Sequence, residues 1–287
     1  MSSGPQCIWP ARAVLGEGPC WHEESRSLLW LDIKGRRLFR YFEDTGEKRE
    51  YALPLMVGSV AVPPDGWSVK RNEAALTLLA GTEKGFAWLI LRKHEVELEI
   101  IADPESHLPG NRFNDGKIGP DGRFYAGTMD NEENLATGAL YALNPKFEVM
   151  QLDAGYRVTN GPAFSPDGRI VYHNDSARQI IYRFVLATDG SLRDREIFHR
   201  FSEGEGYPDG MTTDRYGNLY VAMWDGWRIE IFDPNGQRRK PIQFPVARVT
   251  SCTFAGKNEH LLFVTTAATG THPEEQPLAG GLFRLVL

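Results

Sequence analysis

The chain has few cysteines, no concentration of basic residues and no long hydrophobic run, and each absence excludes a class of protein. Cys7, Cys20 and Cys252 are scattered and form no CxxC pair. This pattern favours reduced thiols over a disulfide framework or a zinc site, with one disulfide left open. No apolar stretch approaches the ~18 residues of a membrane-spanning helix, and the N-terminus lacks the features of a secretory signal. We therefore expect a cytoplasmic protein without a membrane partner.

The charge balance gives no indication of a nucleic-acid partner. Among 287 residues, 38 are Asp or Glu and 32 are Lys or Arg, a formal net charge of −6, and basic residues form only short clusters. A nucleic-acid-binding face requires a concentrated basic patch, so we expect no such partner. Hydrophobic residues make up 41% and charged residues 24% of the chain, as in a globular protein with a sizeable core. We expect a monomer or a weak homodimer.

Several catalytic and nucleotide-binding motifs are also absent. The chain has no GxSxG elbow, no P-loop, no dinucleotide-binding GxGxxG after a strand and no HExxH pair. These absences remove local support for a serine-triad hydrolase, a nucleotide-binding domain and a zinc peptidase. No long stretch has the 3.6-residue hydrophobic period of an amphipathic helix, so the pattern favours a chain built from strands.

Turn signals followed by β-rich runs recur along the whole chain. The runs centre on six apolar residues spaced 43 to 49 positions apart, namely Leu29, Leu78, Phe124, Val171, Leu219 and Leu262. Six such units predict an all-β, six-bladed β-propeller that forms a single domain over residues 1–287. A two-sheet sandwich would account for the strands but not for the near-constant period. The second unit fits least well, because residues 66–77 resemble an insertion between its first two strands.

A polar residue recurs at the equivalent position of each repeated unit, at the start of the expected innermost strand. These residues are Glu17, Ser59, Asn114, Asn160, Asp209 and Ser251. Equivalent positions of different blades form a ring around a propeller axis, so residues from distant parts of the chain are expected to converge there. Any single Asn-Gly or Asp-Gly pair would indicate only a turn. Their recurrence before apolar strands indicates side chains that face the axis.

The four larger members of this ring offer only oxygen atoms as ligands. Glu17 and Asp209 supply carboxylates, and Asn114 and Asn160 supply amide oxygens. Such hard donors suit Ca²⁺, Mg²⁺ or Mn²⁺ better than a soft metal. Two carboxylates crowded at an axis would also repel each other unless a cation lay between them. The pattern therefore predicts a divalent cation at the centre of the propeller.

At these same positions the sequence resembles the regucalcin / gluconolactonase (senescence marker protein) family. The matching stretches are LGEGPCW, NRFNDGKIGPDGRFYAGTM, VTNGPAFSPDG, YPDGMTTDRYGNLYVAMW and PLAGGLFRL. They span essentially the whole chain. The resemblance implies a six-bladed propeller with one divalent cation in its central channel, Ca²⁺ in the first instance and Zn²⁺, Mn²⁺, Mg²⁺ or Fe²⁺ as alternatives. It also implies hydrolysis of sugar lactones, which are small-molecule substrates.

The resemblance assigns roles to individual residues. It implies metal ligands at Glu17, Asn160 and Asp209. It implies substrate-binding residues at Arg112, Asn114 and Glu132. Asp209 would also be the general base, and Asn114 would lie near enough to the metal to be an additional ligand. The alignment at Glu132 crosses a loop, so the neighbouring Glu133 competes for the same role.

Asp115 has two readings. In the register defined by the following glycine it aligns with Glu17, Asn160 and Asp209, whereas the resemblance favours Asn114 at this position. We expect Asp115 to orient the site from behind, with a role in a turn as the alternative. The insertion in the second unit departs from the compact family pattern, which leaves any contribution of that blade to the channel mouth open.

The chemistry of these residues fits lactone hydrolysis. A lactone carbonyl oxygen gains negative charge on attack, and a divalent cation can polarise it or lower the pKa of a water molecule. Asp209 can take the proton of that water. Arg112 can stabilise the oxyanion or hold substrate hydroxyls, with a salt bridge to another blade as its alternative role.

Two other functions use the same scaffold. Hydrolysis of a phosphotriester or other organophosphate could use the same cation, and a propeller could bind Ca²⁺ without catalysing a reaction. Arg112 and Glu132 favour a substrate rich in hydroxyl groups, because an apolar phosphotriester would leave both side chains unpaired.

Overall fold

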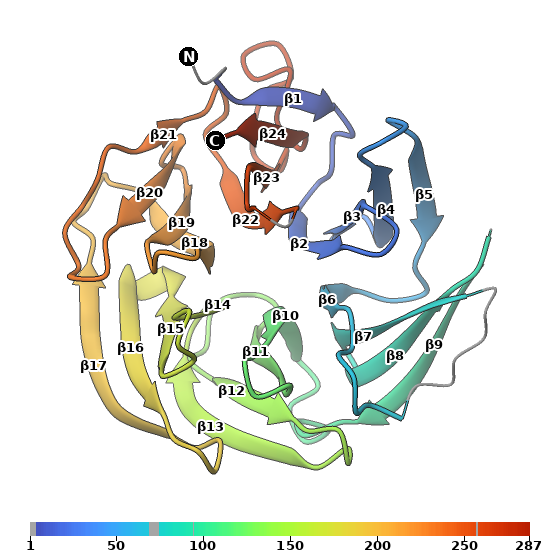
Figure 1. The fold of residues 1–287 in the computed structure, drawn as a ribbon, viewed down its shortest axis with the longest axis vertical. Helices are drawn as coiled ribbons and strands as arrows, with labels where there is room; N and C mark the ends of the chain where they lie inside the picture. The colour runs from blue at the N-terminus through green and yellow to red at the C-terminus, as the bar shows by residue number, and fades with distance from the viewer. Residues whose placement is uncertain (1–3, 69–74, 94, 257) are drawn as a thin grey trace.

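The computed structural model describes residues 4–68, 75–93, 95–256 and 258–287. Six antiparallel sheets of four strands each are arranged radially around one axis (Figure 1). The predicted all-β, six-bladed β-propeller is thereby confirmed. The described ranges contain no α-helix, only a short 3₁₀ turn, η1 (Ser176–Arg178), and no helix there is long and apolar enough to cross a membrane.

Each of the first three blades is a meander of consecutive strands, running from the axis outward. The first blade contains β2 (Gly16–His22), β3 (Ser27–Asp32), β4 (Arg37–Phe42) and β5 (Lys48–Ala52). The second contains β6 (Val57–Ala61), β7 (Leu76–Thr82), β8 (Gly85–Leu91) and β9 (Val96–Ala102). The third contains β10 (Asn111–Ile118), β11 (Phe124–Asp130), β12 (Gly138–Leu143) and β13 (Val149–Tyr156).

The next two blades repeat this order, and the sixth closes the ring with both ends of the chain. The fourth contains β14 (Thr159–Phe164), β15 (Ile170–Asp175), β16 (Ile180–Leu186) and β17 (Leu192–Arg200). The fifth contains β18 (Tyr207–Thr213), β19 (Leu219–Trp224), β20 (Arg228–Phe232) and β21 (Ile242–Gln243). The sixth contains β22 (Val249–Ala255), β23 (Leu261–Thr266), β24 (Leu282–Val286) and, on its outer edge, β1 (Gln6–Trp9). The pairing of β1 with β24 joins the two ends of the chain in one sheet, with Gln6 opposite Arg284.

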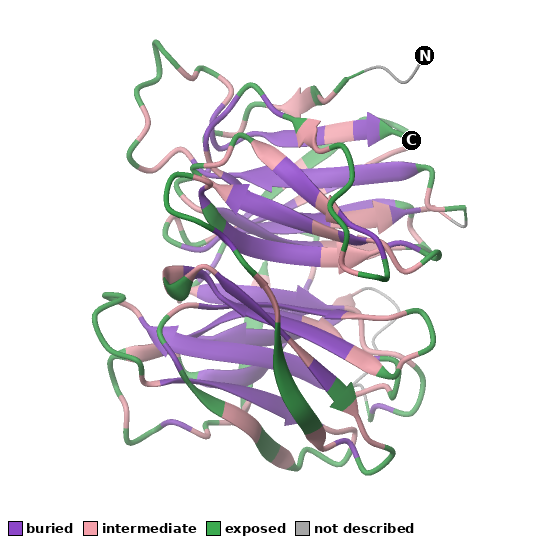
Figure 2. Ribbon diagram, turned by 90° about the vertical axis from the view of Figure 1, so that its left-hand side faces the viewer, coloured by how far each residue is buried: buried purple, intermediate pink, exposed green. Residues whose placement is uncertain are grey.

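The middle strands are buried on both faces because each blade lies between two others. All residues of β3 and β8 are buried, and neither strand alternates between polar and apolar residues. The outermost strands differ. Figure 2 shows exposed residues along the periphery and buried ones inside, and β17 carries a row of charged side chains, which discourages edge-to-edge pairing with another sheet. Burial and charge therefore separate these middle strands from the outermost strand β17.

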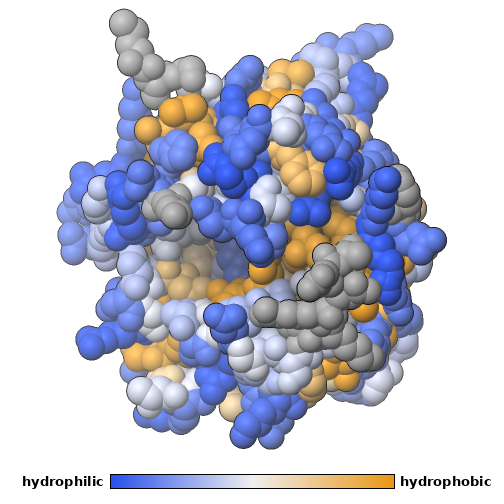
Figure 3. Space-filling model, turned by 45° about the vertical axis from the view of Figure 1, so that its right-hand side comes forward, coloured by the Kyte–Doolittle hydropathy of each residue, from blue (hydrophilic) through white to orange (hydrophobic). Residues whose placement is uncertain are grey.

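The hydrophobic core is divided among the interfaces between adjacent blades. Between the first two blades, for example, Leu31 and Leu38 pack in one cluster with Val57 and Leu89. The surface outside these interfaces is largely hydrophilic in the view of Figure 3, where apolar residues gather beside a hollow. Packing of this kind holds the six inner strands at fixed positions around the axis.

The proposed insertion at 66–77 includes residues 69–74, which lie outside the described residues. Trp67, at its start, is buried and packs edge-to-face against Trp88 with ring centroids 5.9 Å apart. Its indole Nε1 donates a hydrogen bond to the carbonyl oxygen of Gly122 at 2.9 Å, and Gly122 belongs to the third blade. The described beginning of this segment therefore ties the second blade to the third.

All six inner strands have a β-bulge at the same level. In β2, Glu17 pairs with Leu31 but Cys20 pairs with Leu29, so the inner strand has one extra residue there. The inner strands of the other five blades show the same excess of one residue. A bulge bends its strand and re-aims the side chains beside it. The polar ring predicted from the sequence coincides with these bulges.

Candidate active site in the central channel

The glycines that follow the ring residues have a conformational role in two blades. Gly18 and Gly161 follow Glu17 and Asn160 and have φ values of 55° and 84°. Residues with a Cβ rarely adopt this left-handed region, so glycine is favoured there. The polar-residue-plus-glycine pairs are thus local bends, and these bends turn the polar side chains toward the axis. A local bend is therefore present at these positions, and it is compatible with a side chain that serves a site at the axis.

One cavity of about 620 Å³ lies at the axis, and we call it the carboxylate cavity. Its lining includes all six residues predicted as ligands, base or substrate contacts, together with Glu133. These six are Glu17, Arg112, Asn114, Glu132, Asn160 and Asp209. They come from the first, third, fourth and fifth blades, so the propeller brings together residues that are far apart in the sequence.

Glu17 and Asp209 are the two buried carboxylates of this cavity, with exposures of 5% and 6%. Each accepts a hydrogen bond from the next backbone amide, at 3.1 Å from Gly18 and 2.9 Å from Gly210. Burial and the nearby Asp115 raise the pKa of Glu17 to about 8, and burial and Glu17 raise the pKa of Asp209. Within the described ranges neither forms an ion pair with a basic side chain. A cation placed between them would relieve both penalties.

The amide side chains of Asn114 and Asn160 form a continuous network beside these carboxylates. Asn114 Nδ2 donates to the carbonyl oxygen of Thr159 at 2.7 Å and to Asn160 Oδ1 at 2.9 Å. Asn160 Nδ2 in turn donates to Ser176 Oγ at 2.8 Å. Because its nitrogen is engaged by Ser176, the Asn160 oxygen is fixed on the side of Asn114, with a lone pair left for a further contact.

Arg112 is buried in the wall of the cavity without a carboxylate partner among the residues described. Its Nη1 donates to Asn114 Oδ1 at 2.6 Å and to the carbonyl oxygen of Phe113 at 3.1 Å. Its Nε donates to Asn131 Oδ1 at 3.1 Å. The salt bridge considered as an alternative role is therefore not formed within the described ranges. A guanidinium held by neutral acceptors keeps its charge and its remaining N–H groups for a ligand.

Glu132 and Glu133 both line the mouth of the cavity. Glu132 Oε1 accepts a hydrogen bond from Asn131 Nδ2 at 3.1 Å. The charge of Glu133 acts on the interior of the site: burial raises the pKa of Asp209 and Glu133 adds to this rise, whereas burial lowers the pKa of Arg112 and Glu133 opposes this fall. The structure thus gives Glu133 the closer electrostatic connection to the site residues.

Asp115 lies behind the site. Its two carboxylate oxygens accept hydrogen bonds from the backbone amides of Gly116, at 2.8 Å, and Gly161, at 3.0 Å. The second of these bonds links the third blade to the fourth. In strand register Asp115 corresponds to Gly210 and Asn114 corresponds to Asp209, because the bulges span 113–116 and 208–211. Aligning the blades on the following glycine therefore placed Asp115 one residue out of register, and Asn114 is the residue that corresponds to Asp209.

Two residues beside the site were not predicted. Ser176 Oγ donates to the carbonyl oxygen of Pro208 at 2.6 Å, and Asn174 Nδ2 donates to that of Asp209 at 2.8 Å. Together with the bond from Asn160 to Ser176, these contacts connect one predicted ligand to the backbone of another. No motif marks Asn174 or Ser176 in the sequence, because their role depends on the neighbouring blade.

The mouth of the cavity also carries aromatic and basic side chains. Trp224 lines the cavity, and the guanidinium of Arg248 lies 4.6 Å from its ring centroid. Tyr207 and Arg157 line it as well. Flat rings and forked donors of this kind suit a polar ring compound with apolar faces.

The predicted metal ligands do not form a cluster of the usual metal-binding residue types. In the part of the chain that the structure describes, no cluster of three His, Cys, Asp or Glu side chains is arranged to hold a metal ion. The proposed ligands contain two carboxylates and an amide, which is a set of hard oxygen donors. The fit to a hard cation rests on the two buried carboxylates and the oriented Asn160 amide.

Comparison with known proteins supports this architecture. A family model described as the SMP-30/Gluconolactonase/LRE-like region matches residues 15–268. Human regucalcin (Homo sapiens) is 33% identical over 291 residues, which cover 98% of this chain and 93% of the human protein. The structure of a calcium-binding protein, regucalcin, from Agrobacterium tumefaciens has a TM-score of 0.88 and 27% identity, covering 99% of this chain and 93% of that one.

A gluconolactonase from Xanthomonas campestris shares the fold, with a TM-score of 0.77 and 24% identity over 99% of this chain and 89% of that one. The family model includes strands from all six blades, and the positions of Glu17, Asn160 and Asp209 fall within the matched range. The resemblance seen in the sequence is thereby confirmed. This chain belongs to the SMP-30/gluconolactonase/LRE-like family.

Proposed function

We propose that this protein hydrolyses sugar lactones to aldonic acids, with one divalent cation held by Glu17, Asn160 and Asp209. The observation that carries the proposal is the pair of buried carboxylates, Glu17 and Asp209, which lie beside a buried Arg112 at the axis. Two such carboxylates with no basic group at ion-pair distance in the described ranges are costly unless a cation binds them. The family membership supports the same activity.

The oxygen donors favour Ca²⁺ as the resident ion. When bound, a divalent cation supplies Lewis-acid polarisation of the lactone carbonyl and makes a water molecule more acidic. The relative from Agrobacterium tumefaciens is described as a calcium-binding protein, which supports this choice. Asn114 borders Asn160 through its Nδ2, and its Oδ1 accepts a hydrogen bond from Arg112, so its amide would have to turn over to add a further oxygen to the set.

Asp209 is the general base in this proposal. One of its oxygens accepts a hydrogen bond from the Gly210 amide, and the carboxylate would accept a proton from the attacking water through the other. The hydrogen bond from Asn174 Nδ2 to the Asp209 carbonyl oxygen holds the backbone at this point. The carboxylate is thereby oriented by its own blade and by β15.

Arg112 and the acidic pair at the mouth would hold the sugar. The Arg112 guanidinium is fixed by Asn131 and Asn114, so it meets the substrate in a preset orientation. Its positive charge can stabilise the oxygen that becomes negative during attack. A carboxylate from Glu132 or Glu133 would accept hydrogen bonds from sugar hydroxyls, and Glu133 has the stronger electrostatic connection to the site.

A panel of five- and six-carbon aldonolactones, assayed by acid release, tests this function. Protein stripped of metal with a chelator should be inactive, and Ca²⁺ or another of the named divalent ions should restore hydrolysis. Full activity of exhaustively stripped protein would contradict the metal requirement. Hydrolysis of a phosphotriester with no lactone turnover would favour the organophosphate alternative, and metal binding without turnover of either class would favour a binding protein.

A further inference from the structure

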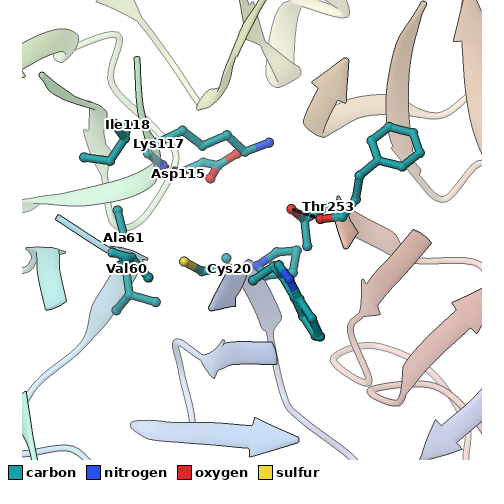
Figure 4. A pocket seen from close by; sticks show the side chains of 13 residues that line it. Cys20, Val60, Ala61, Asp115, Lys117, Ile118 and Thr253 are labelled. Atoms are coloured by element: carbon teal, nitrogen blue, oxygen red, sulfur yellow. Dashed lines mark hydrogen bonds between the residues drawn. The ribbon is translucent and has the colours of Figure 1, made fainter. Parts of the chain in front are cut away.

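A second cavity lies farther along the inner strands, away from the carboxylate cavity. It has a volume of about 350 Å³ and is bordered by the inner strands β2, β6, β10 and β22 (Figure 4). We call it the Lys117 cavity. Most of its wall is apolar, formed by Trp21, Val60, Ala61, Val62, Ile118 and Phe254. A pocket with an apolar wall and a few polar groups is typical of a small-molecule site.

Lys117 is the basic residue in this wall. Its side chain extends from β10 across the cavity, and its Nζ donates a hydrogen bond to the carbonyl oxygen of Met211 in the fifth blade. No carboxylate among the described residues lies within ion-pair distance of it, and its charge acts on the buried carboxyl group of Asp115 in the same wall. An ammonium group has three N–H donors, so two remain for a ligand or for water. Burial raises the pKa of the Cys20 thiol to about 11 and that of the Cys252 thiol to about 12, and the charge of Lys117 offsets part of each rise.

Asp115 forms the boundary between the two cavities. Its carboxylate is fixed by the amides of Gly116 and Gly161, and it lines the Lys117 cavity, whereas the adjacent Asn114 lines the carboxylate cavity. Glu17 and Gly18 are divided in the same way between the two cavities. The two cavities are therefore separated by a layer about one residue thick.

We propose that the Lys117 cavity is a second binding site, which takes a small organic carboxylate with a compact apolar body. The carboxylate would accept hydrogen bonds from Lys117 Nζ, and the apolar body would lie against Val62, Ile118 and Phe254. The wall favours this class over the aldonic acid product, because sugar hydroxyls would find few partners there. It also favours a monoanion over a phosphate dianion, since a second negative charge would face Asp115 with only one cation available.

Benzoate is a suitable probe, because it combines one carboxylate with an apolar ring, and benzamide is its uncharged counterpart. We expect saturable binding of benzoate in a calorimetric titration of the chelator-treated protein, and weaker binding of benzamide. Lys117→Met keeps the apolar stem and removes the charge, and should weaken benzoate binding by roughly tenfold or more, the usual effect of losing a charged hydrogen bond. Lys84→Met, at an exposed lysine, is the matched control and should leave binding unchanged.

The carboxylate cavity must be excluded as the binding place. Arg112→Ala should leave benzoate affinity unchanged, because Arg112 lines only the other large cavity. If Arg112→Ala abolishes binding while Lys117→Met does not, the ligand occupies the carboxylate cavity and the proposal is wrong. Absence of saturation, or equal binding of benzamide, would overturn it as well. None of these readouts depends on lactone hydrolysis, so the proposed function can fail or hold independently.

A second variant keeps the test decisive if Lys117→Met does not fold. Val62 is half-buried in the wall, so Val62→Trp should fill part of the cavity and weaken benzoate binding by a similar factor while the fold is retained. Cys20 gives an independent measurement, because it also lines the cavity. Benzoate should slow alkylation of Cys20 by an uncharged maleimide and leave Cys7 in β1 unaffected. Unchanged binding in Val62→Trp and unprotected Cys20 would together contradict the proposal.

Discussion

The carboxyl groups of Glu17 and Asp209 lie close enough at the propeller axis for Glu17 to add to the burial that raises the pKa of Asp209, although the two residues come from the first and fifth blades. Both are buried, and each has one oxygen fixed by a backbone amide of its own strand. The molecule thus holds two buried carboxyl groups together, and both resist ionisation while no cation is bound. A bound cation is the simplest way to stabilise them, and most of the predictions below depend on it.

The stability of the metal-free protein should fall as the pH rises. Burial raises the pKa of Glu17 from 4.5 to about 8, so the folded protein keeps a proton that the unfolded chain releases at lower pH. The stabilising effect of that proton is complete below about pH 4.5 and is lost as the pH rises through about 8. The difference in Tm between metal-loaded and chelated protein should therefore widen between about pH 5.5 and about pH 8.5.

Glu17→Gln is the control for this pH dependence. It removes one of the two charges, so the chelated variant should lose less stability over the same pH range. A Tm difference between loaded and chelated wild-type protein that is constant with pH would show that this pair does not bind the ion.

Arg112→Ala should weaken substrate binding more than metal binding. The guanidinium contacts Asn114 and Asn131 and lies outside the proposed ligand set, so its loss removes contacts to the sugar. A charged hydrogen bond contributes ~1.5–3 kcal/mol, so kcat/KM should fall by roughly 10- to 100-fold, through KM for the lost sugar contacts and through kcat for the lost oxyanion contact. Steady-state kinetics and a metal titration of the same variant separate the two effects. Loss of metal binding with an unchanged KM would contradict the assignment.

Ser176→Ala should weaken metal binding without removing a ligand. Ser176 Oγ accepts a hydrogen bond from Asn160 Nδ2 and donates to the carbonyl oxygen of Pro208, so it orients the amide oxygen of Asn160. Loss of such an outer contact typically lowers metal affinity by roughly 10- to 100-fold. Activity should recover at high metal concentration, which a general loss of structure would not allow. Ser202→Ala, at an exposed serine, should bind the metal like the wild type.

The two glutamates at the mouth can be separated by substitution. Glu133→Gln should raise KM for sugar lactones by roughly tenfold, because its charge reaches Arg112 and Asp209. Glu132→Gln should have a smaller effect, since Glu132 Oε1 already accepts a hydrogen bond from Asn131. Kinetics of both variants on one lactone decide between them, and a larger effect at Glu132 would restore the assignment that the sequence favoured.

Most of the propeller could be predicted because turns and apolar strands repeat at a near-constant spacing. Leu29, Leu78 and Phe124 each lie in the second strand of a blade, as do the three later repeats. The closing strand β1 could not be predicted in this way, because it belongs to a blade whose other strands are at the far end of the chain. Pairing between distant segments leaves no local period in the sequence.

The sequence located the residues that line the axial cavity to within about one position along each inner strand. Glu17, Asn160 and Asp209 were expected at the axis and line one cavity there. The bulges change which side chains of an inner strand point in a given direction. The sequence therefore could not show that Asp115 faces the Lys117 cavity while Asn114 faces the carboxylate cavity. Ser176 was not found either, because its contacts with Asn160 and Pro208 depend on how two blades pack together.

Turnover by Asp209→Asn at saturating metal tests the central claim most directly. The amide keeps an oxygen that can hold a hard cation but cannot accept a proton at neutral pH. Asn160→Asp is the matched variant, because it adds a charge to the ligand set and leaves the base intact, so it should bind metal more tightly and remain active. The account predicts that folded, metal-saturated Asp209→Asn hydrolyses lactone about 10²- to 10⁴-fold more slowly than the wild type. Turnover within about threefold of the wild type would contradict the assignment of Asp209 as the base.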